Sequence, residues 1–152
     1  MLSGAGSGFA DTAEWDGFYV GEPFPHCFVS ASGGQQCEGY DRDVGCVRAR
    51  PDGRFNVGLA LNFLNGHVCT FHGIGTPMAG ILRLDSDPAQ PSCLMRVTLD
   101  EGVLRQVGDM SADCSRCGSR GGFAGFRLRL VNEADELSEK SSDFEGEPLC
   151  RR

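Results

Sequence analysis

Eight cysteines are the residues of this sequence with the most evident chemistry. They are spread along the whole chain of 152 residues: Cys27, Cys37, Cys46, Cys69, Cys93, Cys114, Cys117 and Cys150. An even number of cysteines at this density is typical of secreted proteins that cross-link a small core. The leading prediction is therefore a set of disulfides formed in an oxidising compartment.

Two other uses of the cysteines remain open. Cys114 and Cys117 have the Cys-x-x-Cys spacing of a zinc site, but the sequence holds no second pair of this kind to complete four sulfur ligands. The same pair could be a redox centre, yet residues 118–122 after it are Gly-Ser-Arg-Gly-Gly, which form helices poorly. We therefore expect no metal site and no cofactor.

The connectivity of the disulfides is not settled by the sequence, because eight cysteines can pair in many ways. Our interpretation joins Cys69 to Cys93 and Cys114 to Cys117. It leaves two bonds among the remaining four cysteines, which are Cys27, Cys37, Cys46 and Cys150.

The three histidines, His26, His67 and His72, are the obvious candidates for a general base. His72 precedes residues 73–77, Gly-Ile-Gly-Thr-Pro, which we interpret as a loop that could bring it to a partner. The sequence contains neither a Gly-x-Ser-x-Gly nucleophile motif nor a His-Glu-x-x-His zinc motif. We expect a protein that is not an enzyme, and keep as an alternative a small hydrolase that uses His72 and a carboxylate.

Alternating apolar residues predict the elements that position these side chains. Phe55, Val57, Leu59, Leu61 and Phe63 recur at every second position, which is the pattern of a half-buried strand. Asn65-Gly66 is a favoured hairpin turn, followed by a return strand over 67–72. Similar patterns predict strands near 17–20, 45–50, 78–85, 93–99, 103–107 and 123–131. We therefore predict a mainly β protein, an antiparallel β-sandwich or small β-barrel with little helix, stabilised by disulfides.

Composition divides the chain into three parts. Residues 1–14 are small and polar and predict a flexible tail, and residues 15–132 form one β-rich domain. Residues 133–152 hold seven acidic against three basic side chains, which predicts an acidic C-terminal tail. A disulfide at Cys150 would anchor the end of this tail.

The charge balance bears on the partners and the compartment. The chain carries 14 basic and 21 acidic residues, a net charge of −7, and Lys140 is the only lysine. This balance disfavours a general nucleic-acid or anionic-membrane surface and fits a basic protein partner. The longest nearly apolar run, residues 57–64, is far shorter than the roughly 20 residues of a membrane helix. Residues 1–8 lack the basic start and apolar core of a signal peptide. Because the cysteines indicate an oxidising compartment, we expect a periplasmic or secreted protein whose targeting segment has been removed.

A longer pattern joins several of these features. It comprises Asn65-Gly-His-Val-Cys69, then Cys93 at the start of a strand, then Cys114-Ser-Arg-Cys-Gly-Ser-Arg-Gly-Gly-Phe-Ala-Gly125. Over residues 45–130 the sequence resembles a group of small exported bacterial proteins of the lysozyme-inhibitor-like type, which share an Asn-Gly-His-x-Cys hairpin and a closing Cys-x2-3-Cys-Gly motif. The resemblance implies an envelope protein that binds another protein.

The function that this resemblance implies is inhibition of a peptidoglycan-degrading enzyme, by a lysozyme inhibitor or by an immunity protein against a competitor's enzyme. Loops pinned by disulfides lose little entropy on binding and could insert into the cleft of such an enzyme. The candidate partner-binding residues, from segments 72–77 and 111–120, are His72, Thr76, Ser111, Asp113, Arg116, Ser119 and Arg120. The two arginines among them could bind carboxylates of the partner. A structural or metal-binding envelope protein is the other alternative.

Overall fold

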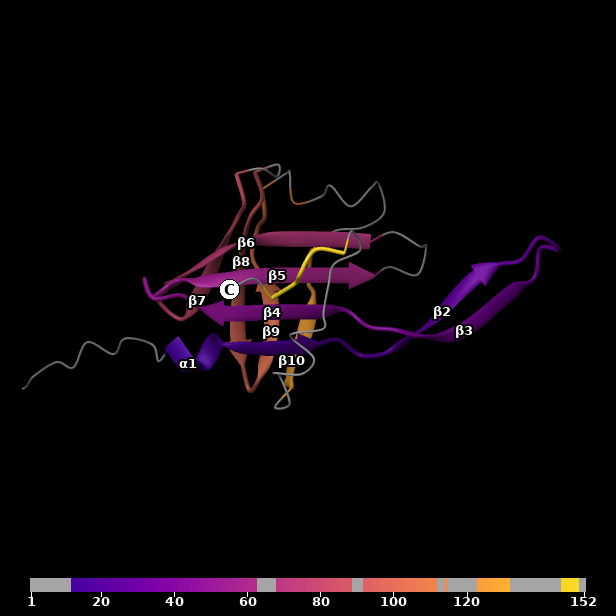
Figure 1. Ribbon diagram of the computed structural model, residues 1–152, viewed down its shortest axis with the longest axis horizontal. Coiled ribbons are helices and arrows are strands. Elements are labelled where there is room, and N and C mark those ends of the chain that lie inside the picture. The colour runs from indigo at the N-terminus through magenta and orange to yellow at the C-terminus, as the bar shows by residue number, and fades with distance from the viewer. Residues whose placement is uncertain are drawn as a thin grey trace, which may run out of the picture.

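The alternating segments of the sequence form strands that pair into a closed antiparallel barrel (Figure 1). The computed structural model describes residues 12–62, 68–88, 92–111, 114, 123–131 and 146–150. Eight strands form the barrel, in the order β1-β10-β9-β8-β7-β6-β5-β4. Their bounds are β1 (Gly17–Val20), β4 (Val44–Ala49), β5 (Phe55–Asn62), β6 (Val68–Met78), β7 (Ile81–Ser86), β8 (Leu94–Asp100), β9 (Val103–Val107) and β10 (Arg127–Val131).

Closure of the barrel depends on the first strand, β1, which pairs with both β4 and β10. The strands from β4 to β10 follow one another in the barrel in the order of the sequence, as an up-and-down meander. Since β1 joins the two ends of this meander, no barrel strand is left with an unpaired edge. Of the two predicted architectures, the barrel is therefore the one that forms.

The interior of the barrel is filled by the inward-facing side chains of every strand. An eight-stranded barrel is just wide enough for side chains to fill it. The largest fully buried ones include Tyr19, Phe55, Phe71, Leu59, Leu82, Leu84, Met95, Leu104 and Leu128. Tyr19 keeps its proton, because burial raises the pKa of its hydroxyl, and it donates a hydrogen bond to Trp15 O at 2.8 Å. Trp15 ends α1 (Thr12–Trp15), the one α-helix in the described ranges; none of those ranges contains a helix long and apolar enough to cross a membrane.

The sheet changes direction at a corner in β6. Strands β1, β4 and β5 run across the view of Figure 1, whereas β8, β9 and β10 run up and down it. Residues 73–75 of β6 pair with β5 on one side and β7 on the other. A Cβ atom at Gly73 would overlap the carbonyl oxygen of Asp85, and one at Gly75 would lie 2.8 Å from Leu82 Cδ2. Glycine is therefore required here for close approach of the two sheet halves.

The segment expected to be a loop, residues 73–77, is thus part of a strand, and that prediction was wrong. Gly-x-Gly and Thr-Pro are turn signals in sequence. Here the glycines admit neighbouring strands at the corner, and Pro77 lies next to the last residue of β6.

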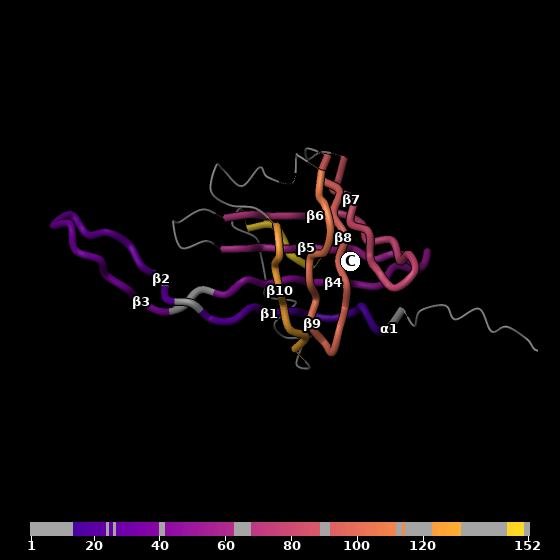
Figure 2. Tube along the Cα trace, turned by 180° about the vertical axis from the view of Figure 1, so that it is seen from behind, coloured from indigo at the N-terminus to yellow at the C-terminus, as the bar shows by residue number. Residues whose placement is uncertain are grey.

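A second sheet consists of two strands, β2 (Phe24–Val29) and β3 (Gln35–Asp41), which pair only with each other. They are inserted between β1 and β4. Figures 1 and 2 show this hairpin extending away from the barrel, and we call residues 24–41 the arm. Pro25 and Gly33-Gly34 are loop signals in the sequence of this region, yet most of its residues form two strands.

Three disulfides join described residues, and Cys69 is disulfide-bonded as well. Cys27–Cys37 and Cys46–Cys150 agree with the expectation that these four cysteines pair with one another. The third bond is Cys93–Cys114, so the predicted Cys69–Cys93 and Cys114–Cys117 bonds were wrong. The sequence separation of 21 between Cys93 and Cys114 did not indicate that the two cysteines lie close together. The β8–β9 hairpin lies between them and returns the chain to the start of β8. The bonds are compatible with an oxidising compartment outside the cytosol.

The C-terminal segment, residues 146–150, packs on the outside of the barrel, where Figure 1 shows it crossing β5. Leu149 is 1% exposed, in a cluster with Phe18, Cys46 and Ala60. A Cβ atom at Gly58 would overlap the Leu149 carbonyl, so this glycine makes room for the segment. Cys46–Cys150 closes a chain separation of 104 residues, which stabilises the folded state by about 5 kcal/mol in the loop-entropy view.

Replacing Gly58 with alanine should destabilise the whole chain. The new methyl group meets backbone that the disulfide prevents from moving away, and overpacking of this kind costs about 1–3 kcal/mol. The measurement is chemical denaturation. The matched control is Gly34→Ala in the exposed arm, where the methyl group meets only Ser30 Oγ at 3.7 Å. Equal unfolding free energies for the two variants would show that the C-terminal segment does not press on Gly58.

Candidate functional site

The two predicted site residues on β6, His72 and Thr76, do not form an exposed recognition loop. His72 is 2% exposed and lies opposite Gly58 in the β5–β6 ladder. Its position on a strand beside the covered outer face, rather than before a loop, explains this burial. A side chain this buried offers little surface to a partner, so the structure gives no support to a contact through His72. The burial also gives no support to a hydrolase that needs His72 as an accessible base.

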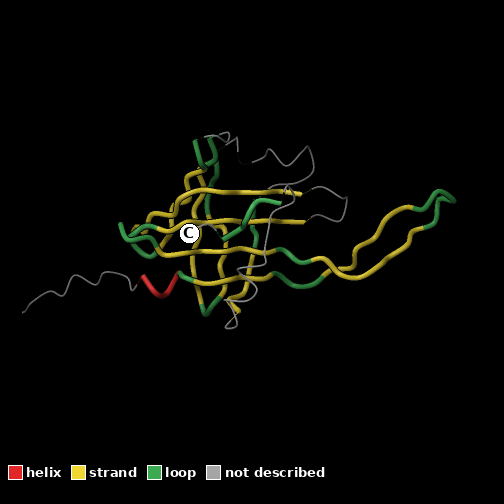
Figure 3. The backbone as a smooth tube through the Cα atoms, in the orientation of Figure 1, coloured by secondary structure: helices red, strands yellow, loops and turns green. Residues whose placement is uncertain are grey.

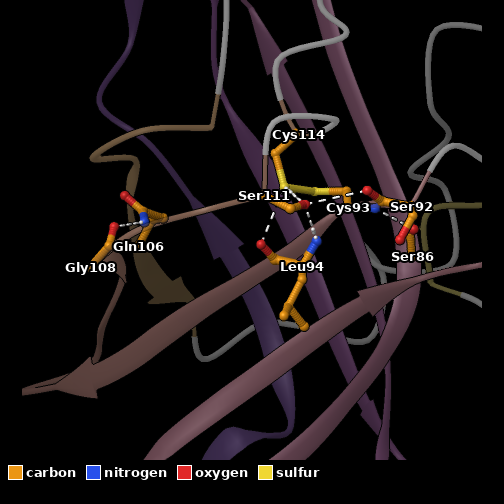
Figure 4. Close-up of a disulfide and its surroundings, with 8 residues drawn as sticks. All are labelled: Ser86, Ser92, Cys93, Leu94, Gln106, Gly108, Ser111 and Cys114. Carbon is orange, nitrogen blue, oxygen red and sulfur yellow. Dashed lines mark hydrogen bonds between the residues drawn. A yellow bond between two sulfur atoms is a disulfide. The ribbon is translucent and has the colours of Figure 1, made fainter.

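Ser111 has a structural role at the Cys93–Cys114 disulfide (Figure 4). Its Oγ accepts a hydrogen bond from Leu94 N at 2.9 Å, and its backbone N donates one to Leu94 O at 3.0 Å. Ser111 O accepts a further bond from Cys114 N at 3.1 Å. Ser111 therefore holds the start of β8 to the disulfide, and this residue is exposed. Thr76 is half-buried and lies opposite Arg83 of β7 in the ladder, whereas Ser111 is hydrogen-bonded to β8.

The other predicted residues, Asp113, Arg116, Ser119 and Arg120, lie outside the described residues. The structure instead draws attention to the arm, which the sequence analysis did not select as a site. Two signals in the sequence point to it. Cys27 and Cys37 lie ten positions apart with Gly33-Gly34 between them, which fits a disulfide across a hairpin, and the apolar pair Phe28-Val29 adjoins Cys27.

The tip of the arm is a tight turn at residues 30–34 (Figure 3). Ser30 N donates to Gly34 O at 2.8 Å, and Gly33 N donates to Ser30 O at 2.9 Å. Gly33 has a φ of 83°, a conformation that glycine adopts without strain. Ser30 Oγ adds a third bond, to Gly34 O at 2.9 Å. The turn is therefore closed by its own hydrogen bonds and needs no contact with the barrel.

Two apolar side chains are exposed beside this tip. Phe28 is 41% exposed and Val29 is 75% exposed. Because successive side chains of a strand point to opposite faces, these two residues place apolar surface on both faces of the arm. Their partners across the ladder, Gln36 and Gln35, are also exposed. The end of the arm thus presents an apolar residue and an amide on each side.

A disulfide reinforces the arm just behind its tip. Isolated two-stranded hairpins are only marginally stable in water. Cys27 and Cys37 face each other in the ladder, with their Cα atoms 4.0 Å apart, and their bond spans ten residues. A bond of this span removes about 3 kcal/mol of chain entropy from the open arm. The apolar side chains are therefore held on a hairpin that remains formed without support from the barrel.

Asp43 fixes the root of the arm to the barrel. Its backbone oxygen accepts a hydrogen bond from Gly21 N at 2.8 Å, across the two strands that leave the barrel. Its Oδ1 accepts one from Asn62 N at 2.7 Å, at the end of β5. Asn62 Nδ2 in turn donates to Arg42 O at 3.0 Å. The direction of the arm is therefore set by Asn62, the last residue of β5.

The arm and its root are acidic. Residues 21–43 contain four acidic side chains and one arginine, a net charge of −3, whereas residues 44–131 contain ten arginines and seven acidic side chains. The charge of the barrel segment is thus opposite in sign to that of the arm. An acidic projection with an apolar tip favours a partner whose binding site is basic at its rim and apolar inside.

No protein-family model, curated protein sequence or solved structure matches this chain significantly. The assignment of a site therefore depends on the geometry alone.

Asp43→Asn should test the role of the arm root through its pH dependence. Burial raises the pKa of Asp43 above its ordinary value of 3.8, against the opposing hydrogen bond from Asn62. The native state then binds this proton more tightly than the unfolded state, so stability falls as pH rises from 3.8 through the raised pKa. Asparagine keeps an acceptor for Asn62 N without the charge.

The unfolding free energy of the variant, relative to the parent, should therefore be higher at about pH 7 than at about pH 3. The measurement is urea denaturation at both pH values, with Asp100→Asn as an exposed control. A relative stability of Asp43→Asn that decreases with pH would contradict the assignment.

Proposed function

We propose that this protein is an extracellular binding protein that inserts its arm into the cleft of another protein. The observation that carries the proposal is the exposure of apolar side chains on both faces of the arm, at Phe28 and Val29. A ribbon that lay flat on a partner would bury only one face. A ribbon that enters a cleft buries both faces, one against each wall.

Rigidity supports insertion over a loose contact. Binding by a flexible loop loses conformational entropy, whereas a hairpin formed in advance avoids most of that cost. The Cys27–Cys37 bond and the hydrogen bonds of the 30–34 turn provide this order before binding. The arm thus has the order before binding that we expected of segments 72–77 and 111–120.

The class of partner follows from charge and from the resemblance noted in the sequence. The arm segment has a net charge of −3, which favours association with a basic protein. Lysozyme-inhibitor-like proteins act on enzymes that degrade peptidoglycan, and we propose a partner of this class. Inhibition would follow from occlusion: the arm fills the cleft that the glycan chain must enter. On this proposal the protein is periplasmic or secreted, and an immunity role against a competitor's enzyme is the variant of the same function.

Serine substitutions at the arm tip should abolish inhibition and leave the fold intact. The experiment measures hydrolysis of peptidoglycan by a panel of basic lysozymes and amidases in the presence of the protein. Phe28→Ser with Val29→Ser removes the apolar surface of both faces, and inhibition should weaken at least about 100-fold, the loss of two well-buried contacts. Val68→Ser with Met78→Ser is the matched control, because these residues are 40% and 46% exposed on the barrel. Inhibition that survives in the arm variant, or fails equally in the control, would refute insertion of the arm.

Removal of the arm disulfide by substitution should weaken binding of the partner without destabilising the barrel. Cys27→Ser with Cys37→Ser frees the hairpin, so affinity for the partner should fall by up to about 100-fold, as expected from about 3 kcal/mol of restored chain entropy. The melting temperature of the barrel should hardly change, because the arm strands pair only with each other. The measurements are calorimetry of binding and circular dichroism on heating. An unchanged affinity would mean that preorganisation of the arm is not used.

A further inference from the structure

A second surface, on the side of the barrel formed by β7 to β10, carries a concentration of arginines. Side chains facing outward from these four strands include Arg83, Arg96, Arg105, Arg127 and Arg129, and we call these five residues the arginine face. The two ends of this stripe are exposed, at Arg96 and at Arg127 and Arg129. Figure 2 shows strands β8, β9 and β10 of this surface running vertically, with the arm extending to the left, away from them.

The register places these arginines side by side. Arg83 lies directly opposite Arg96 in the β7–β8 ladder, and Arg105 lies directly opposite Arg127 in the β9–β10 ladder. Like charges directly opposite each other on one face of a sheet are destabilising. Each pair therefore places two like charges close together, and an anion bound between them would relieve the repulsion.

Few carboxylates neutralise this face. Asp85 pairs with Arg83 at 3.1 Å, and Asp100 pairs with Arg105 at 3.2 Å. Among the residues that the structure describes, no carboxylate forms an ion pair with Arg96, Arg127 or Arg129. The turn between β4 and β5 differs, because there Asp52 binds both Arg50 and Arg54. Hydrogen bonds from Arg54 hold the pKa of Asp52 well below its ordinary value.

The face has the shape of a diagonal stripe. From Arg83 and Arg96 it passes Thr98, which lies opposite Arg105, and continues to Arg127 and then Arg129. With strands about 4.8 Å apart and alternate residues about 6.7 Å apart, the stripe is about 20 Å long, with a charge every 5–8 Å or so. This spacing suits a linear polymer with one anionic group per unit.

We propose that the arginine face binds a linear anionic polysaccharide. Guanidinium groups form paired hydrogen bonds with carboxylate, sulfate or phosphate groups, which are the anions that such glycans carry. Apart from Asp85 and Asp100, the remaining outward positions of these strands hold small or aliphatic side chains such as Thr98, Val103 and Val107, and none is aromatic. Protein interfaces usually depend on buried aromatic anchors, so this face is better suited to an extended charged chain.

Two features argue against nucleic acid as the ligand. The outside of a closed barrel is convex, whereas direct reading of duplex DNA needs a helix or ribbon that enters a groove. The disulfides are compatible with a compartment outside the cytosol, where glycans are the abundant linear polyanions. The net charge of −7 conceals this face, because most of the acidic residues belong to segments outside it.

The test compares two charge-matched triple variants by calorimetric titration at low salt. Arg96→Gln, Arg127→Gln and Arg129→Gln together remove the unpaired charges of the face. Arg42→Gln, Arg50→Gln and Arg54→Gln together remove the same net charge elsewhere. Circular dichroism on heating confirms that both variants fold. The probes are polygalacturonate (carboxylate), heparin (sulfate), neutral dextran, polyglutamate and duplex DNA.

The parent protein should bind polygalacturonate or heparin and not dextran. The face variant should bind the same glycan at least tenfold more weakly, with a shallower dependence of affinity on salt, because fewer counterions are released. The control variant should stay within twofold of the parent. The Phe28→Ser, Val29→Ser arm variant should bind the glycan normally, so a failure of the arm proposal does not affect this result.

Three results would overturn the inference. Equal losses in both triple variants would mean that net charge alone governs binding. Tighter binding of polyglutamate than of either glycan would assign the face to an acidic protein. Binding of duplex DNA as tight as that of the glycans would identify a general polyanion surface.

Discussion

The pairing of β1 with two neighbours, β4 on one side and β10 on the other, is the contact on which the rest of this structure depends. It joins the first strand of the chain to the last one of the barrel, so the meander becomes a cylinder with no open edge. The interior then receives one side chain from every second position of every strand, including Tyr19, Phe55 and Leu104. A meander left open would have two unpaired edges.

Closure also decides where the arm lies. Strands β1 and β4 are neighbours in the barrel, and the chain between them forms the arm by extending the same hairpin outward. The arm therefore leaves the barrel at a fixed place, beside the end of β5, where Asp43 and Asn62 are hydrogen-bonded. A projection of this kind needs its own source of order, and the Cys27–Cys37 bond provides it.

The outside of the barrel is divided between two environments. Over β1, β4 and β5 the outer face is apolar and is covered by residues 146–150, with Cys46–Cys150 holding them in place. Over β7 to β10 the outer face carries arginines, several of them exposed. Small residues at Gly58 and Ala60 permit the first arrangement, and cross-strand arginine pairs characterise the second. The two proposed binding surfaces, the arm and the arginine face, are thus built on different strands and can act separately.

Much of the fold could be derived from the sequence, because strand formation depends on local alternation. The period of two that begins at Phe55 is a local signal, and the structure has β5 over Phe55–Asn62. The Pro51-Asp52-Gly53 and Asp100-Glu101-Gly102 sequences are local turn signals, and Gly53 and Gly102 lie in turns with positive φ. The even number of cysteines indicated disulfides, and the bonds among Cys27, Cys37, Cys46 and Cys150 are present. Alternation and turns depend only on residues close together in the chain, and the prediction of disulfides depends only on the number of cysteines.

Only the tertiary structure decided what depends on the return of distant segments. Closure of the barrel, the Cys93–Cys114 bond and the burial of His72 each require knowing which strands become neighbours, and residue types alone do not specify that. In the sequence, the glycines of residues 73–75 indicated a loop. Their role in the structure is to let two strands approach closely at a corner, and this role can be recognised only when both strands are in place. The arginines were counted from the sequence, but the register of four strands determined that five of them share one face.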